Sequence, residues 1–137
     1  MLPRSALPAL HVGVDLVRVT RIEESLARFG ARFAERVFCP AEIAYCEGAP
    51  AERARRYAAR LAAKEAAWKA LGLDDRGHAW HAIEVTRDER GACAIALHEP
   101  LRGRAIAAGV APLSLSLTHE DDYAAAVVLA ARAAPSS

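Results

Sequence analysis

Apolar and polar positions follow one another along this chain with a period that changes at a few points, and these changes divide it into elements. Residues 10–17 are a short, nearly continuous apolar run with several β-branched side chains, which is typical of a buried strand, and they include one acid, Asp15. Thr20 and Glu23 have the spacing of a capping box, so a helix is expected to begin at Thr20 and to end at Gly30.

Three further helical segments are expected in the first half of the chain. Residues 31–38 form a short one, and Pro40, at a first helical position where its missing N–H is tolerated, opens another. The longest helix is expected to run from Pro50 to about Leu71, because Gly72 is a favourable residue just beyond a helix C-terminus.

The second half of the chain changes to strand patterns. A polar loop is expected at residues 74–80, followed by a hairpin of two strands at 82–87 and 92–97. A helix is then expected at 100–108, and two final strands at 113–118 and 123–131. The first of the final strands alternates apolar and hydroxyl residues, as a half-buried strand does, and the second is nearly all apolar. The order β-ααα-ββ-α-ββ predicts an α+β domain with a mostly antiparallel sheet.

The length and composition are those of one ordinary globular domain. The chain has 137 residues, of which 53% are hydrophobic and 26% charged, so we expect a single domain over residues 1–137 with flexible ends at about 1–9 and 132–137. Alanine dominates the apolar share and fills little core volume. Closely approaching elements, and burial against other subunits, are therefore expected.

The charge and cysteine content exclude several classes of protein. A formal net charge of +1 argues against a nucleic-acid-binding protein, which usually carries a marked basic excess. Cys39, Cys46 and Cys93 show no metal-binding spacing and are expected to be free thiols in a reducing compartment. No signal peptide and no apolar run of about 20 residues is recognised, so the protein is expected to be cytoplasmic and not bound to a membrane.

The long predicted helix carries a basic stripe and an acid–base pair. Arg53, Arg56, Arg60 and Lys64 fall within an arc of about 80°, which is most simply a solvated helix face. Glu65 lies four residues before a second lysine, at position 69, on a different arc; by spacing alone this pair is an ordinary helix salt bridge.

Three residues outside that helix stand out. Asp15 lies in an apolar strand, where an acid is costly unless it pairs with an arginine or holds a hard cation such as Mg²⁺. Gly13, in the same strand, indicates a close backbone approach. His119 follows an alternating strand and by itself is an ordinary turn residue. No GxGxxG, P-loop, GxSxG or HExxH motif occurs, which removes the commonest nucleotide-binding and hydrolase templates.

Five segments, taken in order, carry a resemblance to a known family. They are GVD at 13–15 with RI at 21–22, FAERVF at 33–38 followed by Glu42, ARLAAKEAAWKALG at 59–72, IEV at 83–85, and LSLTH at 115–119 with YAAAVV at 123–128. Together they resemble holo-acyl-carrier-protein synthases, the short type of 4'-phosphopantetheinyl transferase. Two positions depart from the family pattern: His11 replaces a common glycine and Leu61 a common aromatic residue.

The resemblance implies an activity and a set of site residues. The activity is the Mg²⁺-dependent transfer of 4'-phosphopantetheine from coenzyme A to a serine of apo acyl carrier protein, with 3',5'-ADP as the other product. Asp15 and Glu65 match the magnesium carboxylates, and the serine proton goes either to Glu65 or to a metal-bound water. Lys69 would stabilise the transferring phosphate. The residues that would contact coenzyme A are Arg60, Lys64, Ser116, Thr118 and His119, the last three from a neighbouring subunit.

The resemblance also implies partners. Related enzymes form homotrimers with sites at the subunit boundaries, and Arg21 and Arg28, seven residues apart, would dock an acidic carrier. Chain length favours a carrier of fatty acid biosynthesis, whereas a polyketide or other specialised carrier is the alternative client. Two readings of other classes stay open: a coenzyme A-binding module without transferase activity, and a purely structural trimer.

Overall fold

A computed structural model describes residues 9–73 and 79–132 of the chain. Its strands and α-helices are β1 (Ala9–Arg18), α1 (Val19–Phe29), α2 (Ala31–Val37), α3 (Pro40–Glu47), α4 (Arg53–Leu71), β2 (Ile83–Arg87), β3 (Cys93–Leu97), α5 (Leu101–Ala107), β4 (Leu113–His119) and β5 (Tyr123–Arg132), with 3₁₀ turns η2 (Pro50–Glu52) and η3 (Trp80–Ala82). The expected flexible ends, except residues 9 and 132, and most of the expected loop at 74–80 lie outside the described residues.

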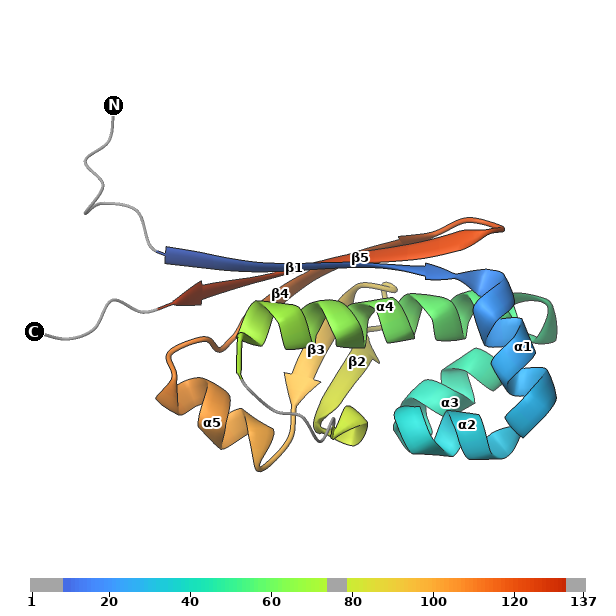
Figure 1. Cartoon of the computed structure of the whole chain (residues 1–137), viewed down its shortest axis with the longest axis horizontal. Coiled ribbons are helices and arrows are strands. Elements are labelled where there is room, and N and C mark those ends of the chain that lie inside the picture. The colour runs from blue at the N-terminus through green and yellow to red at the C-terminus, as the bar shows by residue number, and fades with distance from the viewer. Residues whose placement is uncertain (1–8, 74–78, 133–137) are drawn as a thin grey trace, which may run out of the picture.

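The described strands form two antiparallel sheets, which confirms the α+β class. β5 lies between β1 and β4 in a three-stranded sheet, and β2 pairs with β3 in a hairpin. Helix α4 runs along one face of the larger sheet. The short helices α1–α3 lie near the end of the sheet where β1 leads into α1 (Figure 1). The order of helical and strand blocks is the predicted one, and the four helical segments expected before the hairpin correspond to α1, α2, α3 and α4.

Two helix starts differ from the predictions. The capping box at Thr20 and Glu23 is wrong: α1 begins at Val19, with Arg18 at the N-cap and no side-chain cap. The N–H of Val19 instead donates to the backbone carbonyl of Asp122 at 2.9 Å, so the turn between β4 and β5 satisfies a donor that a local cap would otherwise serve. Pro50 opens the short turn η2, and α4 itself starts at Arg53.

The contact between α4 and β1 depends on small residues, and the close backbone approach predicted at Gly13 is confirmed. A Cβ atom on Gly13 would lie 1.9 Å from the backbone oxygen of Ala66 and 2.8 Å from the backbone nitrogen of Ala70. Every alanine of α4 from Ala58 onward is fully buried. The helix therefore lies against the strand almost backbone to backbone, and the residues that follow Gly13 on the same face of β1 also meet α4.

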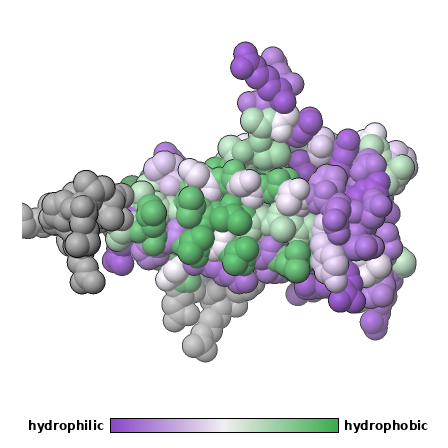
Figure 2. Space-filling model, turned by 90° about the horizontal axis from the view of Figure 1, so that it is seen from above, coloured by the Kyte–Doolittle hydropathy of each residue, from purple (hydrophilic) through white to green (hydrophobic). Residues whose placement is uncertain are grey.

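The other face of the three-stranded sheet is not covered within this chain. β1 was expected to be buried, yet its alternate side chains point away from α4 and are well exposed. The exposed apolar residues on this face are Leu10, Val12, Val14 and Leu16 of β1 with Val127 and Leu129 of β5. Figure 2 looks onto this face and shows apolar side chains gathered over the sheet, with polar residues at its edge. Among the described residues, no helix has the length and apolar character needed to span a membrane.

Candidate active site

Strand β1 and helix α4 bring Asp15, Glu65 and Lys69 together. Asp15 is two residues beyond Gly13, so its side chain lies on the strand face that packs against α4, and only 13% of it is exposed. Lys69 Nζ lies 3.3 Å from Asp15 Oδ1 and donates to the Val14 backbone carbonyl at 2.9 Å. The cation next to Asp15 is thus this lysine and not one of the arginines that the sequence offered, so Lys69 forms an ion pair with β1 across the two elements.

The carboxyl group of Glu65 is perturbed by its burial and by Asp15. Burial, followed by the hydrogen bond and negative charge of Asp15, raises the pKa of Glu65 to about 7, whereas the positive charges of Arg21 and Lys69 act in the opposite direction. Oδ2 of Asp15 is buried and finds no hydrogen-bond partner among the described residues. A buried carboxylate oxygen without a donor, beside a second carboxyl group that resists ionisation, is an incomplete electrostatic arrangement.

A small hard cation would complete this arrangement. Mg²⁺ prefers carboxylate oxygens and commonly takes only one or two of them from a protein, because water and substrate phosphates supply its other ligands. Within residues 9–73 and 79–132, no group of three or more His, Cys, Asp or Glu side chains converges as a complete metal cage. The two carboxylates of Asp15 and Glu65 therefore fit an open site of the magnesium type.

The predicted basic stripe of α4 faces α3 and takes part in packing. Arg56 and Arg60 both lie over the ring of Tyr45, with guanidinium carbons 4.0 and 4.1 Å from the ring centroid. Arg53 pairs with Glu47 at 2.7 Å. Arg60 is only 4% exposed, so the expectation of a solvated face is wrong for this part of the helix. The buried position of Arg60 also does not support its predicted contact with coenzyme A.

Lys64 contradicts its predicted role more directly. Its side chain is fully buried, and its ammonium group contacts Glu42 Oε1 at 2.8 Å and donates to the backbone carbonyls of Trp80 at 3.0 Å and Ile83 at 2.7 Å. Three N–H donors thus have three acceptors, and none is left for a phosphate. Lys64 is thus a component of the protein interior, and its contacts give no support to the predicted binding of coenzyme A.

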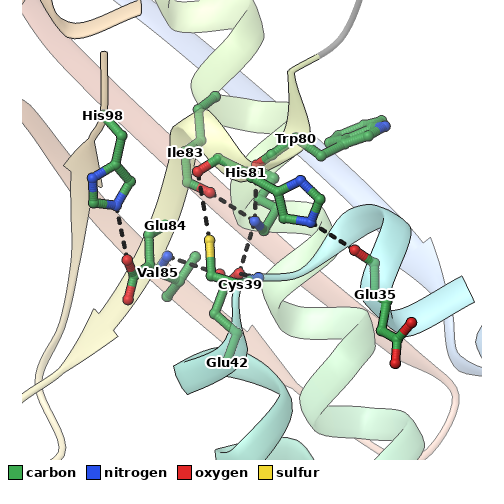
Figure 3. A network of polar contacts seen from close by, with 10 residues as sticks. Glu35, Cys39, Glu42, Trp80, His81, Ile83, Glu84, Val85 and His98 are labelled. Atoms are coloured by element: carbon green, nitrogen blue, oxygen red, sulfur yellow. Dashed lines mark hydrogen bonds and ion pairs between the residues drawn. The ribbon is translucent and has the colours of Figure 1, made fainter. Parts of the chain in front are cut away.

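Glu42, which the sequence singled out only as part of the resemblance, is the partner of that lysine. It accepts hydrogen bonds from the backbone N–H groups of Cys39 at 2.7 Å and Val85 at 2.9 Å. Figure 3 shows these contacts between the start of α3 and β2, together with the neighbouring bond from His81 Nε2 to the Glu35 carbonyl. A sequence signal for Glu42 was available. It lies in the first turn of α3, three residues after the N-cap residue Cys39, where an acid can accept from the N-cap N–H.

The residues expected to contact the nucleotide lie apart from the carboxylates. Ser116 and Thr118 are exposed and point to the uncovered face of the sheet, because the leucines that alternate with them are half-buried on the other side. His119 ends β4 and is exposed beside a hollow at the sheet's edge, lined by Leu16, Thr118, His119, Glu120, Tyr123 and Ala125. Ser116 and Thr118 thus lie on the sheet face opposite Asp15, and one chain alone does not bring them to the carboxylates.

The predicted carrier-docking arginines occupy the outer side of α1. Ile22 and Leu26 are buried, whereas Arg21 and Arg28 are exposed. Arg21 is close enough to lower the pKa of Glu65, so this end of α1 adjoins the candidate site. A hollow lined by Phe29, Arg32, Phe33 and Arg36 continues the basic surface onto α2.

Both the fold and the paired carboxylates agree with a group of transferases. The chain belongs to the 4'-phosphopantetheinyl transferase superfamily, whose family model matches residues 11–128. Within it, the chain is similar to holo-[acyl-carrier-protein] synthases. The one from Koribacter versatilis is 43% identical over 121 residues, covering 88% of this chain and 96% of the relative. The one from Anaeromyxobacter dehalogenans is 46% identical over 129 residues, covering 92% and 98%.

A solved structure has the same fold. The ACPS–CoA complex of Chronobacterium ammoniagenes superposes with a TM-score of 0.80 and is 31% identical, covering 92% of this chain and 99% of that chain. The fold and the family therefore agree.

Proposed function

We propose that this chain transfers the 4'-phosphopantetheine group of coenzyme A to a serine hydroxyl of an apo acyl carrier protein. The serine oxygen forms a bond to the phosphorus that carries the pantetheine arm, the bond from that phosphorus to 3',5'-ADP breaks, and the serine proton passes to a base. The observation that carries the proposal is the convergence of Asp15, Glu65 and Lys69, from β1 and α4, in a chain of this family.

Asp15 and Glu65 would hold Mg²⁺ in this reaction. Bound there, the ion would neutralise charge on the pyrophosphate and stabilise the departing 3',5'-ADP. Asp15 would supply its Oδ2 atom, which has no hydrogen-bond partner among the described residues. The ammonium group of Lys69, whose side chain is 57% exposed, can reach substrate from its position beside Asp15. It would hold negative charge on the phosphate under attack.

The serine proton would pass either to Glu65 or to a water held by the metal. Without metal, burial beside Asp15 raises the pKa of Glu65 to about 7, and a bound Mg²⁺ would lower it. An ordinary exposed glutamate, by contrast, would be too weak a base to accept a proton efficiently at neutral pH.

Ser116, Thr118 and His119 would contact the nucleotide from a neighbouring subunit of a homotrimer. The uncovered sheet face supports this, because Val12, Val14 and other large apolar side chains on it are more than half exposed in the single chain. The hydroxyl residues of β4 share that face. Covering the face with a second copy would bury the apolar residues and place Ser116 and Thr118 at the boundary between subunits.

The acidic carrier would dock on the basic surface of α1, through Arg21 and Arg28. Both are exposed, and Arg21 adjoins the candidate site, so a carrier bound here would have its serine near Glu65. We assign the reaction to the cytoplasm and to fatty acid biosynthesis. The described cysteines are all free thiols, which fits a reducing compartment, and the short chain fits a fatty-acid carrier.

The test is to incubate the protein with apo carrier, coenzyme A and Mg²⁺ and to weigh the carrier by intact-protein mass spectrometry. A gain of one phosphopantetheine that requires Mg²⁺ is expected. A gain with only a specialised carrier would keep the chemistry and change the pathway. Coenzyme A binding without any gain would leave a binding module and refute the transferase.

A further inference from the structure

Helix α4 carries two residues of the candidate site, and its contact with β1 is made by small residues. The helix meets β1 through Gly13 and through alanines, all of them fully buried. Helices resist rotation and sliding when large side chains interdigitate with their neighbours, and alanine offers only shallow ridges. The contact with β1 brings α4 close to the sheet. Large buried residues of α4, such as Tyr57, Leu61 and Trp68, help to orient the helix, and directional polar contacts can add to this in holding Glu65 in register with Asp15.

One fully buried ion pair lies on another side of the helix. Lys64 and Glu42 are both 0% exposed in their side chains, and Lys64 Nζ lies 5.6 Å from the centroid of the Phe38 ring. A buried ion pair contributes little net stability compared with well-packed apolar residues of the same size, because both charges lose their water. Stability alone is therefore a weak reason for this pair.

The contacts of the pair join four parts of the chain. Lys64, from α4, has all three N–H donors satisfied by the carboxylate of Glu42 and by carbonyls in η3 and at the start of β2. Glu42, from α3, also accepts from the N–H groups of Cys39 and Val85. Rotation or sliding of α4 would break several of these directional bonds at once, each of them costly to leave unmade in the interior.

We propose that Glu42 and Lys64 are positioning residues for the site, and that their buried pair fixes the rotation of α4 so that Glu65 faces Asp15. Lys64 and Glu65 are consecutive in the helix and point about 100° apart, so the direction of one determines the direction of the other. A register role is the best-attested use of buried polar pairs. The inference rests on the proposed function of Asp15 and Glu65 as the metal site.

The test replaces the pair by apolar residues of similar size and compares metal binding at matched stability. The variant is Glu42→Met with Lys64→Met, and the control is Leu101→Ala, which removes a buried side chain of α5 away from the site. The measurements are thermal unfolding, the Kd of Mg²⁺ by titration calorimetry without substrates, and the kcat and KM of transfer.

The double variant is expected to unfold at a lower temperature, because the N–H groups of Cys39 and Val85 lose their acceptor, to bind Mg²⁺ at least roughly tenfold more weakly and to lose at least roughly tenfold in kcat. Its KM for carrier should change less than about threefold, because α1 carries the docking surface. The control should unfold at a lower temperature with an unchanged Kd. A folded double variant with wild-type Kd and kcat would overturn the inference.

Two further measurements separate a failure of the positioning role from misfolding of the double variant and from a failure of the proposed metal site. If the double variant does not fold, Glu42→Gln removes the charge and keeps the size: a weakened Mg²⁺ Kd supports the positioning role, and an unchanged one overturns it. If wild type and Asp15→Asn bind Mg²⁺ equally, or neither binds it, the proposed metal site fails. In that case a crystal structure of the double variant decides the positioning role, since an unmoved Glu65 side chain refutes it.

Discussion

Asp15 and Glu65, distant in the sequence, lie half-buried beside each other where β1 crosses α4, and Asp15 makes Glu65 harder to ionise. The pKa of Glu65 is raised to about 7, by burial first and by the adjacent Asp15 next. Without a bound cation, the negative charge of this carboxyl pair is reduced by a proton on Glu65. Metal binding, proton binding and stability are therefore linked in this enzyme.

The stabilisation of the chain by Mg²⁺ should grow as pH rises. Because the native pKa of Glu65 is raised from 4.5 to about 7, the metal-free native chain binds more protons than the unfolded chain between these values, and it loses stability as pH rises through them. Mg²⁺ needs the deprotonated carboxylate. The shift in melting temperature on adding Mg²⁺ should be larger at about pH 8 than at about pH 5.5. Equal shifts at both pH values, or the same pH dependence in Glu65→Gln, would contradict this.

Removing either carboxylate should abolish most activity. Asp15→Asn and Glu65→Gln are each expected to lower kcat/KM by roughly 10²–10³-fold, because each removes one charge from the phosphate-transfer site. Steady-state assays with saturating carrier measure the loss. Glu89→Gln, in the exposed turn after β2, is the matched control and should retain wild-type activity. Full activity in either site variant would remove that residue from the site.

Gly13→Ala should destabilise the fold. The new methyl group would lie 1.9 Å from the Ala66 oxygen, so β1 and α4 must separate. A loss of at least about 2 kcal/mol in the free energy of unfolding is expected, measured by urea denaturation. Gly103→Ala, inside α5, meets only the flexible Glu99 side chain and should be neutral or gain up to about 1 kcal/mol. A loss no greater than in this control would show that the close approach is not required.

Charge reversal on α1 should affect the carrier and not coenzyme A. Arg21→Glu and Arg28→Glu are each expected to raise the KM for carrier roughly tenfold, with a much smaller change for coenzyme A. Arg28→Glu is the cleaner variant, because Arg21 also acts on the pKa of Glu65. Arg90→Glu, exposed between β2 and β3, controls for net charge. Equal effects on both substrates would remove the docking assignment.

The cysteines should differ in reactivity. Burial raises the pKa of Cys39 to about 11 and that of Cys46 to about 12, so only about one Cys39 thiol in a thousand is ionised at pH 8. Cys93 is half-buried. Iodoacetamide at pH 8 is expected to add one group to the native chain, at Cys93, and three after denaturation, as counted by mass spectrometry. Rapid labelling of Cys46 in the native chain would contradict its burial.

Local sequence patterns were sufficient for the elements but not for their contacts. Gly30 and Gly72 end α1 and α4 as predicted, because both adopt positive φ where other residues are strained. Thr20 failed as a cap, since the donor at the start of α1 is satisfied by Asp122 from the far end of the chain. A capping pattern depends only on residues that are close in the sequence, so it could not predict a hydrogen-bond partner in the turn between β4 and β5.

The sequence by itself determined the order and type of the secondary-structure elements, the position of Gly13 at a close approach, and Asp15 as an acid that needed a partner. Each depends on properties of neighbouring residues. Only the tertiary structure decided that Lys64 is an interior residue while Lys69, one turn and a little further along α4, reaches the site. The physical reason is that a lysine can be buried only where distant segments supply an acceptor for every N–H, and periodicity along one helix does not record those acceptors.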